Sequence, residues 1–226
     1  VVDRRDQQRF CSRYQEILCT VPNPGNYAQY MLEAEAAERH EMKIADVLFF
    51  STDLNAGWSD FHYPSVEFKV ADADTKGAEI YTQLVQDPDE YVKYHTRKVC
   101  EILFWTDKDP INKIDTIKYT LREYDGISSK GGAPPTIFIQ YSTKHVEKSA
   151  EQSLYKLDFE TRGVLYHELT HGYQHEPKGI GSYGTNREFW ASIEGVADAV
   201  RAEAGLFDMS TRKPGGNWMD GYRTTG

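Results

Sequence analysis

The stretch Asp158–His175, D-F-E-T-R-G-V-L-Y-H-E-L-T-H-G-Y-Q-H, contains the pattern H-E-x-x-H at His167, Glu168 and His171. On an α-helix, residues four apart lie on the same face, so both imidazoles can reach one metal ion. Neutral imidazole is a preferred zinc ligand. Glu168 adjoins the first histidine, where it can accept a proton from a water that the metal activates. The stretch therefore predicts an active-site helix with Zn²⁺ as cofactor.

The flanks of this stretch carry helix signals. Asp158 is a candidate N-cap, Glu160 places a negative charge in the first turn, and Pro177 ends the helix. The alternative is a chance H-E-x-x-H on an ordinary amphipathic helix. Average residue usage gives such a match in a chain of this length on the order of once in a hundred.

A second helix is expected over residues 185–207. Thr185 and Glu188 fit a capping box at its start, and Gly205 is a natural stop at its end. Within it, two carboxylates lie four residues apart in an apolar stretch. Burying a carboxylate is costly unless it is paired or binds a metal, so this helix predicts the missing ligand.

The two carboxylates are Glu194 and Asp198. The pattern E-x-x-x-D after H-E-x-x-H resembles that of gluzincin metalloproteases. The resemblance implies that Glu194 is the third zinc ligand and that Asp198 hydrogen-bonds the far nitrogen of His167, as outer carboxylates do. A simpler role for Asp198 is an ion pair with Arg201. His175, four residues past His171, is a weaker candidate ligand, because three ligands along one helix would strain tetrahedral geometry.

A closer resemblance covers roughly the last 160 residues. The segments G-V-L-Y-H-E-L-T-H-G-Y-Q (163–174) and I-E-G-V-A-D-A-V-R (193–201) are similar to the basic secretory protein family of plants and bacteria. The similarity extends through I-F-I-Q-Y-S-T (137–143) and G-G-N-W-M-D-G-Y (215–222). It implies a zincin fold, a peptide or protein substrate, including a glycoprotein, and a secreted, periplasmic or cell-surface location.

The chain departs from this family in two respects: it is acidic, and it stops at Gly226, where relatives are expected to continue. We therefore expect residues 56–226 to form a zincin-like peptidase domain, truncated at its C-terminus. Residues 1–55 are expected to be an N-terminal extension or the remnant of a preceding domain.

The composition excludes several classes of partner. The chain has 35 acidic and 26 basic residues and a net charge of −9, which argues against nucleic acid and anionic membranes. No apolar run of about 18 residues predicts a transmembrane segment, and the start lacks an apolar signal-peptide region. Among three cysteines, Cys11 and Cys19 are able to form a disulfide, whereas Cys100 is expected to be buried in a helix.

Hydrophobic patterns predict an α+β protein with a small mixed sheet. A helix is expected from Asp87-Pro88 to about Trp105, and residues 128–135, S-S-K-G-G-A-P-P, are expected to be a loop. Alternating apolar residues predict strands within 65–70, 114–124 and 136–143. In zincins an edge strand beside the cleft pairs with the extended substrate, and we assign this role to 136–142 or 117–123.

Together these features predict a zinc-dependent peptidase with His167, His171 and Glu194 as metal ligands and Glu168 as general base. Tyr183 is a candidate for stabilising the oxyanion, as are Tyr222 and Arg187, and the sequence does not choose among them. Two other functions fit the same residues. One is a catalytically inactive, peptidase-like binding module; the other is a hydrolase of non-peptide amides or glycan-linked substrates.

Overall fold

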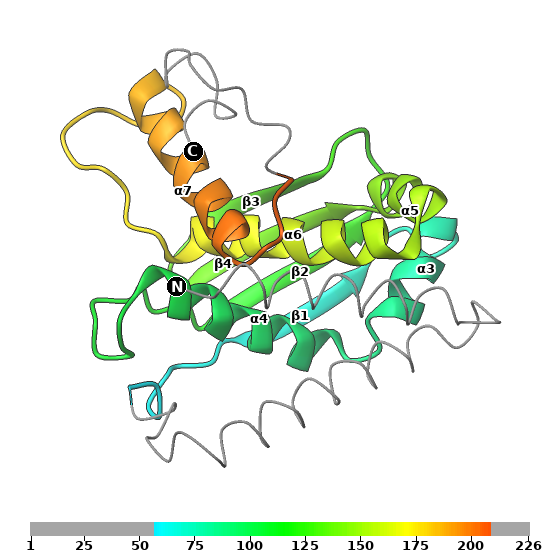
Figure 1. Cartoon of the computed structure of the whole chain (residues 1–226), viewed down its shortest axis with the longest axis horizontal. Helices are drawn as coiled ribbons and strands as arrows, with labels where there is room; N and C mark the ends of the chain where they lie inside the picture. Colours follow the sequence, from blue (N-terminus) through cyan, green and yellow to red (C-terminus); the bar gives the residue numbers. More distant parts are fainter. Residues whose placement is uncertain (1–56, 209–226) are drawn as a thin grey trace, which may run out of the picture. The chain divides into compact units, whose positions relative to one another are not determined.

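The computed structural model describes residues 57–208 of the 226-residue chain. The predictions for residues 1–55, for Tyr222 and for the Cys11–Cys19 disulfide lie outside the described residues. The elements follow one another as β1 (Ser65–Val70), α3 (Lys76–Leu84), α4 (Pro88–Leu103), β2 (Thr116–Arg122), β3 (Ser128–Ala133), β4 (Thr136–Ser142), α5 (Thr143–Gln152), α6 (Leu154–Tyr173) and α7 (Arg187–Glu203) (Figure 1). The predicted α+β class with a mixed sheet is confirmed.

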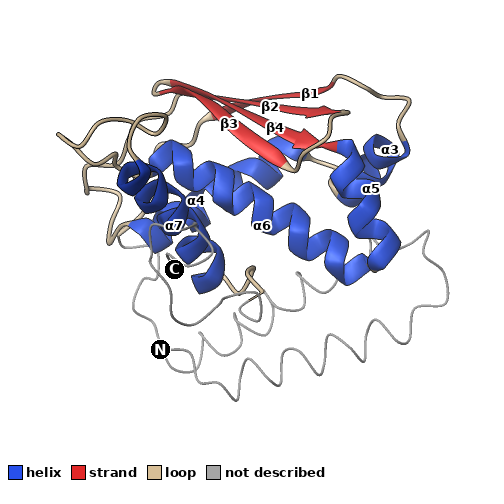
Figure 2. Ribbon diagram, turned by 90° about the horizontal axis from the view of Figure 1, so that it is seen from above, coloured by secondary structure: helices blue, strands red, loops and turns tan. Residues whose placement is uncertain are grey.

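The strands form one sheet in the order β1-β2-β4-β3. β1, β2 and β4 run parallel, and β3 runs antiparallel to β4. The register places Phe68, Tyr119, Ile139 and Lys130 in one row across the sheet. Paired residues point to the same face, and Tyr119 and Ile139 are buried, so all four side chains lie on the core side of the sheet. The helices cover this one side of the sheet (Figure 2).

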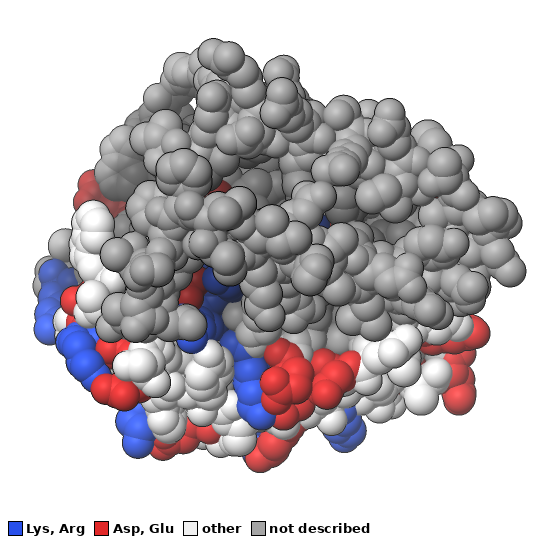
Figure 3. Space-filling view, turned by 60° about the horizontal axis from the view of Figure 1, so that its bottom comes forward, with Lys and Arg blue, Asp and Glu red and all other residues white. Residues whose placement is uncertain are grey.

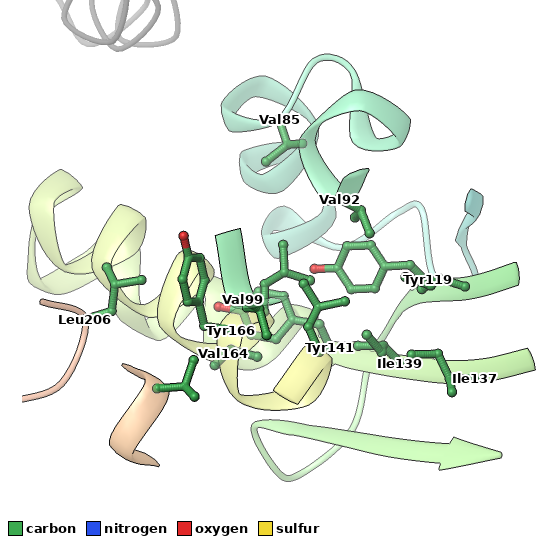
Figure 4. Packing of buried hydrophobic residues seen from close by; sticks show 14 of the residues in the cluster. Val85, Val92, Val99, Tyr119, Ile137, Ile139, Tyr141, Val164, Tyr166 and Leu206 are labelled. Carbon is green, nitrogen blue, oxygen red and sulfur yellow. The ribbon is translucent and has the colours of Figure 1, made fainter. Parts of the chain in front are cut away.

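The core fills the space between this face and the helices. Tyr119, Ile139 and Tyr141 of the sheet meet Val99 of α4 and Val164 of α6 in one buried cluster (Figure 4). Burying a side chain of this size contributes roughly 1.5–3 kcal/mol. The sheet and α4 together therefore form a firm support for α6. Cys100, on the inward face of α4, has no exposed surface, as predicted.

The active-site helix begins earlier than predicted. Ser153 is the N-cap of α6, because its hydroxyl accepts a hydrogen bond from the backbone N–H of Lys156 at 2.9 Å. The predicted N-cap, Asp158, lies inside the helix, where its buried carboxylate pairs with Arg162 four residues later. The prediction was wrong because an i, i+4 ion pair satisfies Asp158 without a helix end.

The predicted start of α7 was also wrong, by one residue. Asn186, not Thr185, caps the helix: its side-chain oxygen accepts from the backbone N–H groups of Glu188 and Phe189. Thr185 instead bonds to Ser182 in the preceding turn. The predicted stop at Gly205 is confirmed.

Gly205 has a φ of +71°, which suits glycine, and it ends α7 in a Schellman motif. The backbone N–H of Leu206 donates to the carbonyl of Arg201 at 2.8 Å, and that of Gly205 donates to the carbonyl of Ala202 at 3.0 Å.

Residues 128–133, predicted as part of a loop, form the strand β3. Its glycines and serines give no apolar alternation, but six residues pair with β4. β3 lies at the edge of the sheet, whereas β2 and β4 each have neighbours on both sides. Neither strand that is predicted to pair with substrate is therefore an edge strand; the edge strand next to β4 is β3.

The surface of the described part carries both signs of charge. On the face shown in Figure 3, Lys and Arg side chains lie among Asp and Glu. In the described part, no helix has the length and hydropathy needed to cross a membrane.

The buried histidine of α4 gives a stability prediction. His95 is 4% exposed, packs against Tyr91 and Tyr166, and its Nδ1 has no hydrogen-bond partner among the described residues. Burial lowers the pKa of His95 to about 3. Because the unfolded chain binds a proton near pH 6.5 and the folded chain does not, His95 lowers stability as the pH falls below 6.5.

We expect His95→Phe to weaken this acid sensitivity. Between pH 7.5 and pH 5.0 the free energy of unfolding should fall by about 2 kcal/mol less in the variant than in the parent. Urea unfolding at both pH values measures the difference. An equal fall in both proteins would show that His95 is protonated in the folded state.

Candidate functional site

Three side chains from two helices converge at the site. His167 and His171 project from α6, and Glu194 projects from α7. The Nε2 atoms of the two histidines lie 3.0 Å apart. Oε2 of Glu194 lies 3.2 Å from Nε2 of His167, and its Oε1 lies 3.6 Å from Nε2 of His171. One donor atom from each residue therefore lies within 4.8 Å of the others.

This donor set fits a tetrahedral metal ion. Zinc bonds of 2.0–2.1 Å at tetrahedral angles place neighbouring ligand atoms about 3.4 Å apart. The two imidazole nitrogens are 3.0 Å apart, and each has a carboxylate oxygen of Glu194 near that distance, Oε2 at 3.2 Å from His167 and Oε1 at 3.6 Å from His171. Two imidazoles and one carboxylate are also the ligand types that zinc takes at catalytic centres, where a fourth position stays open.

Asp198 contacts His167 at Nδ1, the ring nitrogen that does not face Glu194 and His171. Its Oδ1 is 3.1 Å from Nδ1 of His167, and its carboxylate is almost fully buried. Burial lowers the pKa of His167, but the hydrogen bonds with Asp198 and Glu194 outweigh burial and raise this pKa to about 9. Asp198 thus keeps a proton on Nδ1, so the proton that a metal ion would displace from this ring is the one on Nε2, the nitrogen directed toward Glu194 and His171.

The second histidine has a different environment. Burial, together with the nearby His167, lowers the pKa of His171 to about 4. Its Nδ1 contacts the side-chain amide of Gln174 at 2.7 Å. A neutral imidazole is the form that binds metal, and burial maintains that form.

Glu168 points toward the sheet edge. The hydroxyl of Ser128 on β3 donates to Oε1 of Glu168 at 2.5 Å. Burial raises the pKa of this carboxyl group, while His167 and the Ser128 hydroxyl oppose the rise. The sheet edge thereby positions the carboxylate next to the candidate metal ligands.

Tyr183 contacts one member of the ligand cluster, which consists of His167, His171 and Glu194. Its hydroxyl donates to Oε1 of Glu194 at 2.7 Å, and half of the residue is exposed. Burial and the hydrogen bond to Glu194 raise the pKa of Tyr183, so it stays a donor. Arg187 is exposed at the start of α7. His175 turns away from the ligand cluster, and its ring packs edge-on against Phe104 at 5.9 Å.

A cavity of about 830 Å³ contains all of these groups except Arg187 and His175. Its walls come from β3, α6 and α7, and Figure 1 shows both β3 and α7 beside α6. Lys130 of β3 also lines it, on the same face of the sheet as Ser128. Burial lowers the pKa of Lys130, against the opposing effect of Glu176 and Glu168.

Sequence reasoning missed three residues of this site: Ser128, Lys130 and Gln174. The first two lie in a segment rich in glycine and serine, whose pattern is that of a loop. A signal for Gln174 was present, since it follows His171 by three residues and therefore faces the same side of the helix.

Comparison with known proteins gives one finding on the family. A family model described as "BSP: Peptidase of plants and bacteria" matches residues 63–226. No curated protein sequence matches the chain.

The contact between Ser128 and Glu168 gives a prediction about the carboxyl group. Removing the hydroxyl in Ser128→Ala takes away a hydrogen bond that favours the ionised form, so the pKa of Glu168 should rise. The carboxyl group would then stay protonated up to a higher pH.

The measurement is a ¹³C NMR titration of the Glu168 carboxyl in metal-free protein. Ser129→Ala is the matched control, because successive side chains on a strand point to opposite faces. A Glu168 pKa unchanged in Ser128→Ala, or raised equally in the control, would contradict the assignment.

Proposed function

We propose that this chain, which belongs to a family of peptidases of plants and bacteria, hydrolyses peptide bonds with a Zn²⁺ ion held by His167, His171 and Glu194. The observation that carries the proposal is the meeting of these three ligand atoms within 4.8 Å, at one cavity that also holds Glu168. The family match alone supports a peptidase-like role, and the ligand geometry supports zinc as the metal.

When bound, zinc supplies Lewis-acid polarisation of the scissile carbonyl and lowers the pKa of a water molecule. The protein's own groups supply the rest. Glu168 follows His167 directly in sequence, and its carboxylate lines the same cavity as the ligand atoms. In the proposed reaction Glu168 accepts a proton from the attacking water and then donates that proton to the nitrogen of the leaving amine.

The environment of Glu168 suits both steps. A general base works best when its pKa approaches the working pH, and burial raises the pKa of Glu168 toward that range. The Ser128 hydroxyl keeps the carboxylate in one orientation. A fixed carboxylate loses little conformational freedom when it meets the water, which favours proton transfer.

Tyr183 is the proposed donor to the oxyanion. Its phenol lies at the cavity, and its raised pKa keeps the proton on the oxygen at neutral pH. The hydroxyl contacts Glu194, so donation to substrate requires the half-exposed side chain to exchange this partner.

The edge strand supports a peptide as substrate. β3 borders the cavity with Ser128 and Lys130, and its outer edge has no neighbouring strand among residues 57–208. An extended peptide is able to pair along such an edge by backbone hydrogen bonds, which binds main chain without demanding one sequence. A glycoprotein is one such substrate, and a secreted, periplasmic or cell-surface location suits a peptidase of this kind.

Glu168→Gln separates the roles of metal binding and proton transfer. The amide keeps the size of the carboxyl group and still accepts a hydrogen bond from Ser128, but it cannot take the water proton. We expect turnover of a fluorogenic peptide library to fall by roughly 10²–10⁴-fold. Zinc content, measured by elemental analysis, should stay equal to that of the parent.

Glu151→Gln, the same change at an exposed position of α5, is the control and should retain parental turnover. Unchanged turnover in Glu168→Gln would exclude this mechanism. A parent that binds zinc but cleaves no peptide would favour the inactive binding module.

A further inference from the structure

Hydrogen bonds hold the backbone of Gln174 in place at the end of α6. Gln174 is the C-cap residue, and its backbone N–H donates to the carbonyl of Thr170 at 2.8 Å. The side-chain amide of Asn112 donates to the carbonyls of Tyr173 and Gln174 at 3.3 and 3.4 Å. With its backbone held from two sides, Gln174 directs its side chain back toward the ligand cluster.

The amide of Gln174 meets the ring of His171. Gln174 is 6% exposed, and its Nε2 lies 2.7 Å from Nδ1 of His171. Its Oε1 is buried without a hydrogen-bond partner among the described residues. A half-turn about the last side-chain bond exchanges the oxygen and nitrogen, which have nearly the same shape.

The two orientations of the amide select different tautomers of the imidazole. When the amide nitrogen donates to Nδ1, the ring proton lies on Nε2, and Nε2 cannot bind a metal. When the amide oxygen faces the ring, Nδ1–H donates to it and the lone pair of Nε2 is free. Only the second orientation is compatible with His171 as a ligand.

We propose that Gln174 is a positioning residue whose side-chain oxygen accepts the Nδ1–H of His171 and so fixes the metal-binding tautomer. The inference rests on the proposed zinc site and deepens it. Gln174 then does for the second histidine what Asp198 does for the first, since a ligating histidine generally donates its other N–H to an acceptor.

The chemistry of the cavity explains why an amide suits this place. Glu168, Glu194 and Asp198 already bring three buried carboxylates to the cavity. In the metal-free cavity a neutral acceptor orients His171 without adding a fourth negative charge that must be buried. A bound divalent metal ion would offset such a charge, so a carboxylate at this position would still be compatible with zinc binding.

Two variants distinguish an acceptor from a space-filling side chain. Gln174→Met keeps the length of the side chain but removes the acceptor, and should weaken zinc binding by roughly 10–100-fold. Gln174→Glu keeps an acceptor oxygen and loses the amide donor. Because the proposal requires only the acceptor, the zinc affinity of this variant should stay within about threefold of that of the parent. Competition titration of the full chain against a chromogenic zinc chelator gives each affinity.

Gln83→Met, at an exposed position of α3, is the control and should bind zinc as the parent does. Thermal unfolding of each metal-free variant checks that the fold is retained. If Gln174→Met does not fold, Gln174→Glu decides alone: parental affinity supports an acceptor role, and a 10-fold or greater loss overturns it.

The outcomes separate this inference from the proposed function. Parental affinity in Gln174→Met, or equal losses in Gln174→Met and Gln174→Glu, would overturn the role of Gln174 and leave the zinc site standing. A parent that binds no zinc would overturn both.

Discussion

The site depends on carboxylates of one helix being buried against imidazoles of another. Asp198 and Glu194 are 1% and 8% exposed, and each lies within 3.2 Å of a nitrogen of His167. A carboxylate at such depth is strongly unfavourable unless it is paired. The contacts of α6 with α7 thus include the groups that form the candidate metal centre. The site cannot lose one partner without leaving another buried and uncompensated.

The sequence predicted the parts of the site that follow from helix geometry. His167 and His171 are four residues apart, as are Glu194 and Asp198, so each pair lies on one helix face whatever surrounds it. The resemblance to a known family predicted that the face of α6 with the two histidines meets the face of α7 with the two carboxylates. The helix ends were less accurate, because Asp158 and Thr185 have the right chemistry for a cap but find other partners in the folded chain.

The sequence did not predict the contribution of β3 to the site, and the reason is physical. A strand held by backbone pairing needs no apolar alternation, and S-S-K-G-G has the composition of a loop. Only the register with β4 shows that Ser128 and Lys130 share the face that α6 covers. The hydroxyl that contacts Glu168, the proposed general base, therefore comes from a segment 40 residues upstream, which no local pattern indicates.

The central claim is that His167, His171 and Glu194 together hold one zinc ion. The most direct measurement is the zinc content of the parent and of Glu194→Ala, purified side by side without chelator and analysed for metal. The account predicts about one zinc per parent chain and a large loss in the variant, because catalytic zinc takes three protein ligands. Equal zinc in both proteins, or none in the parent after zinc is added, would contradict it.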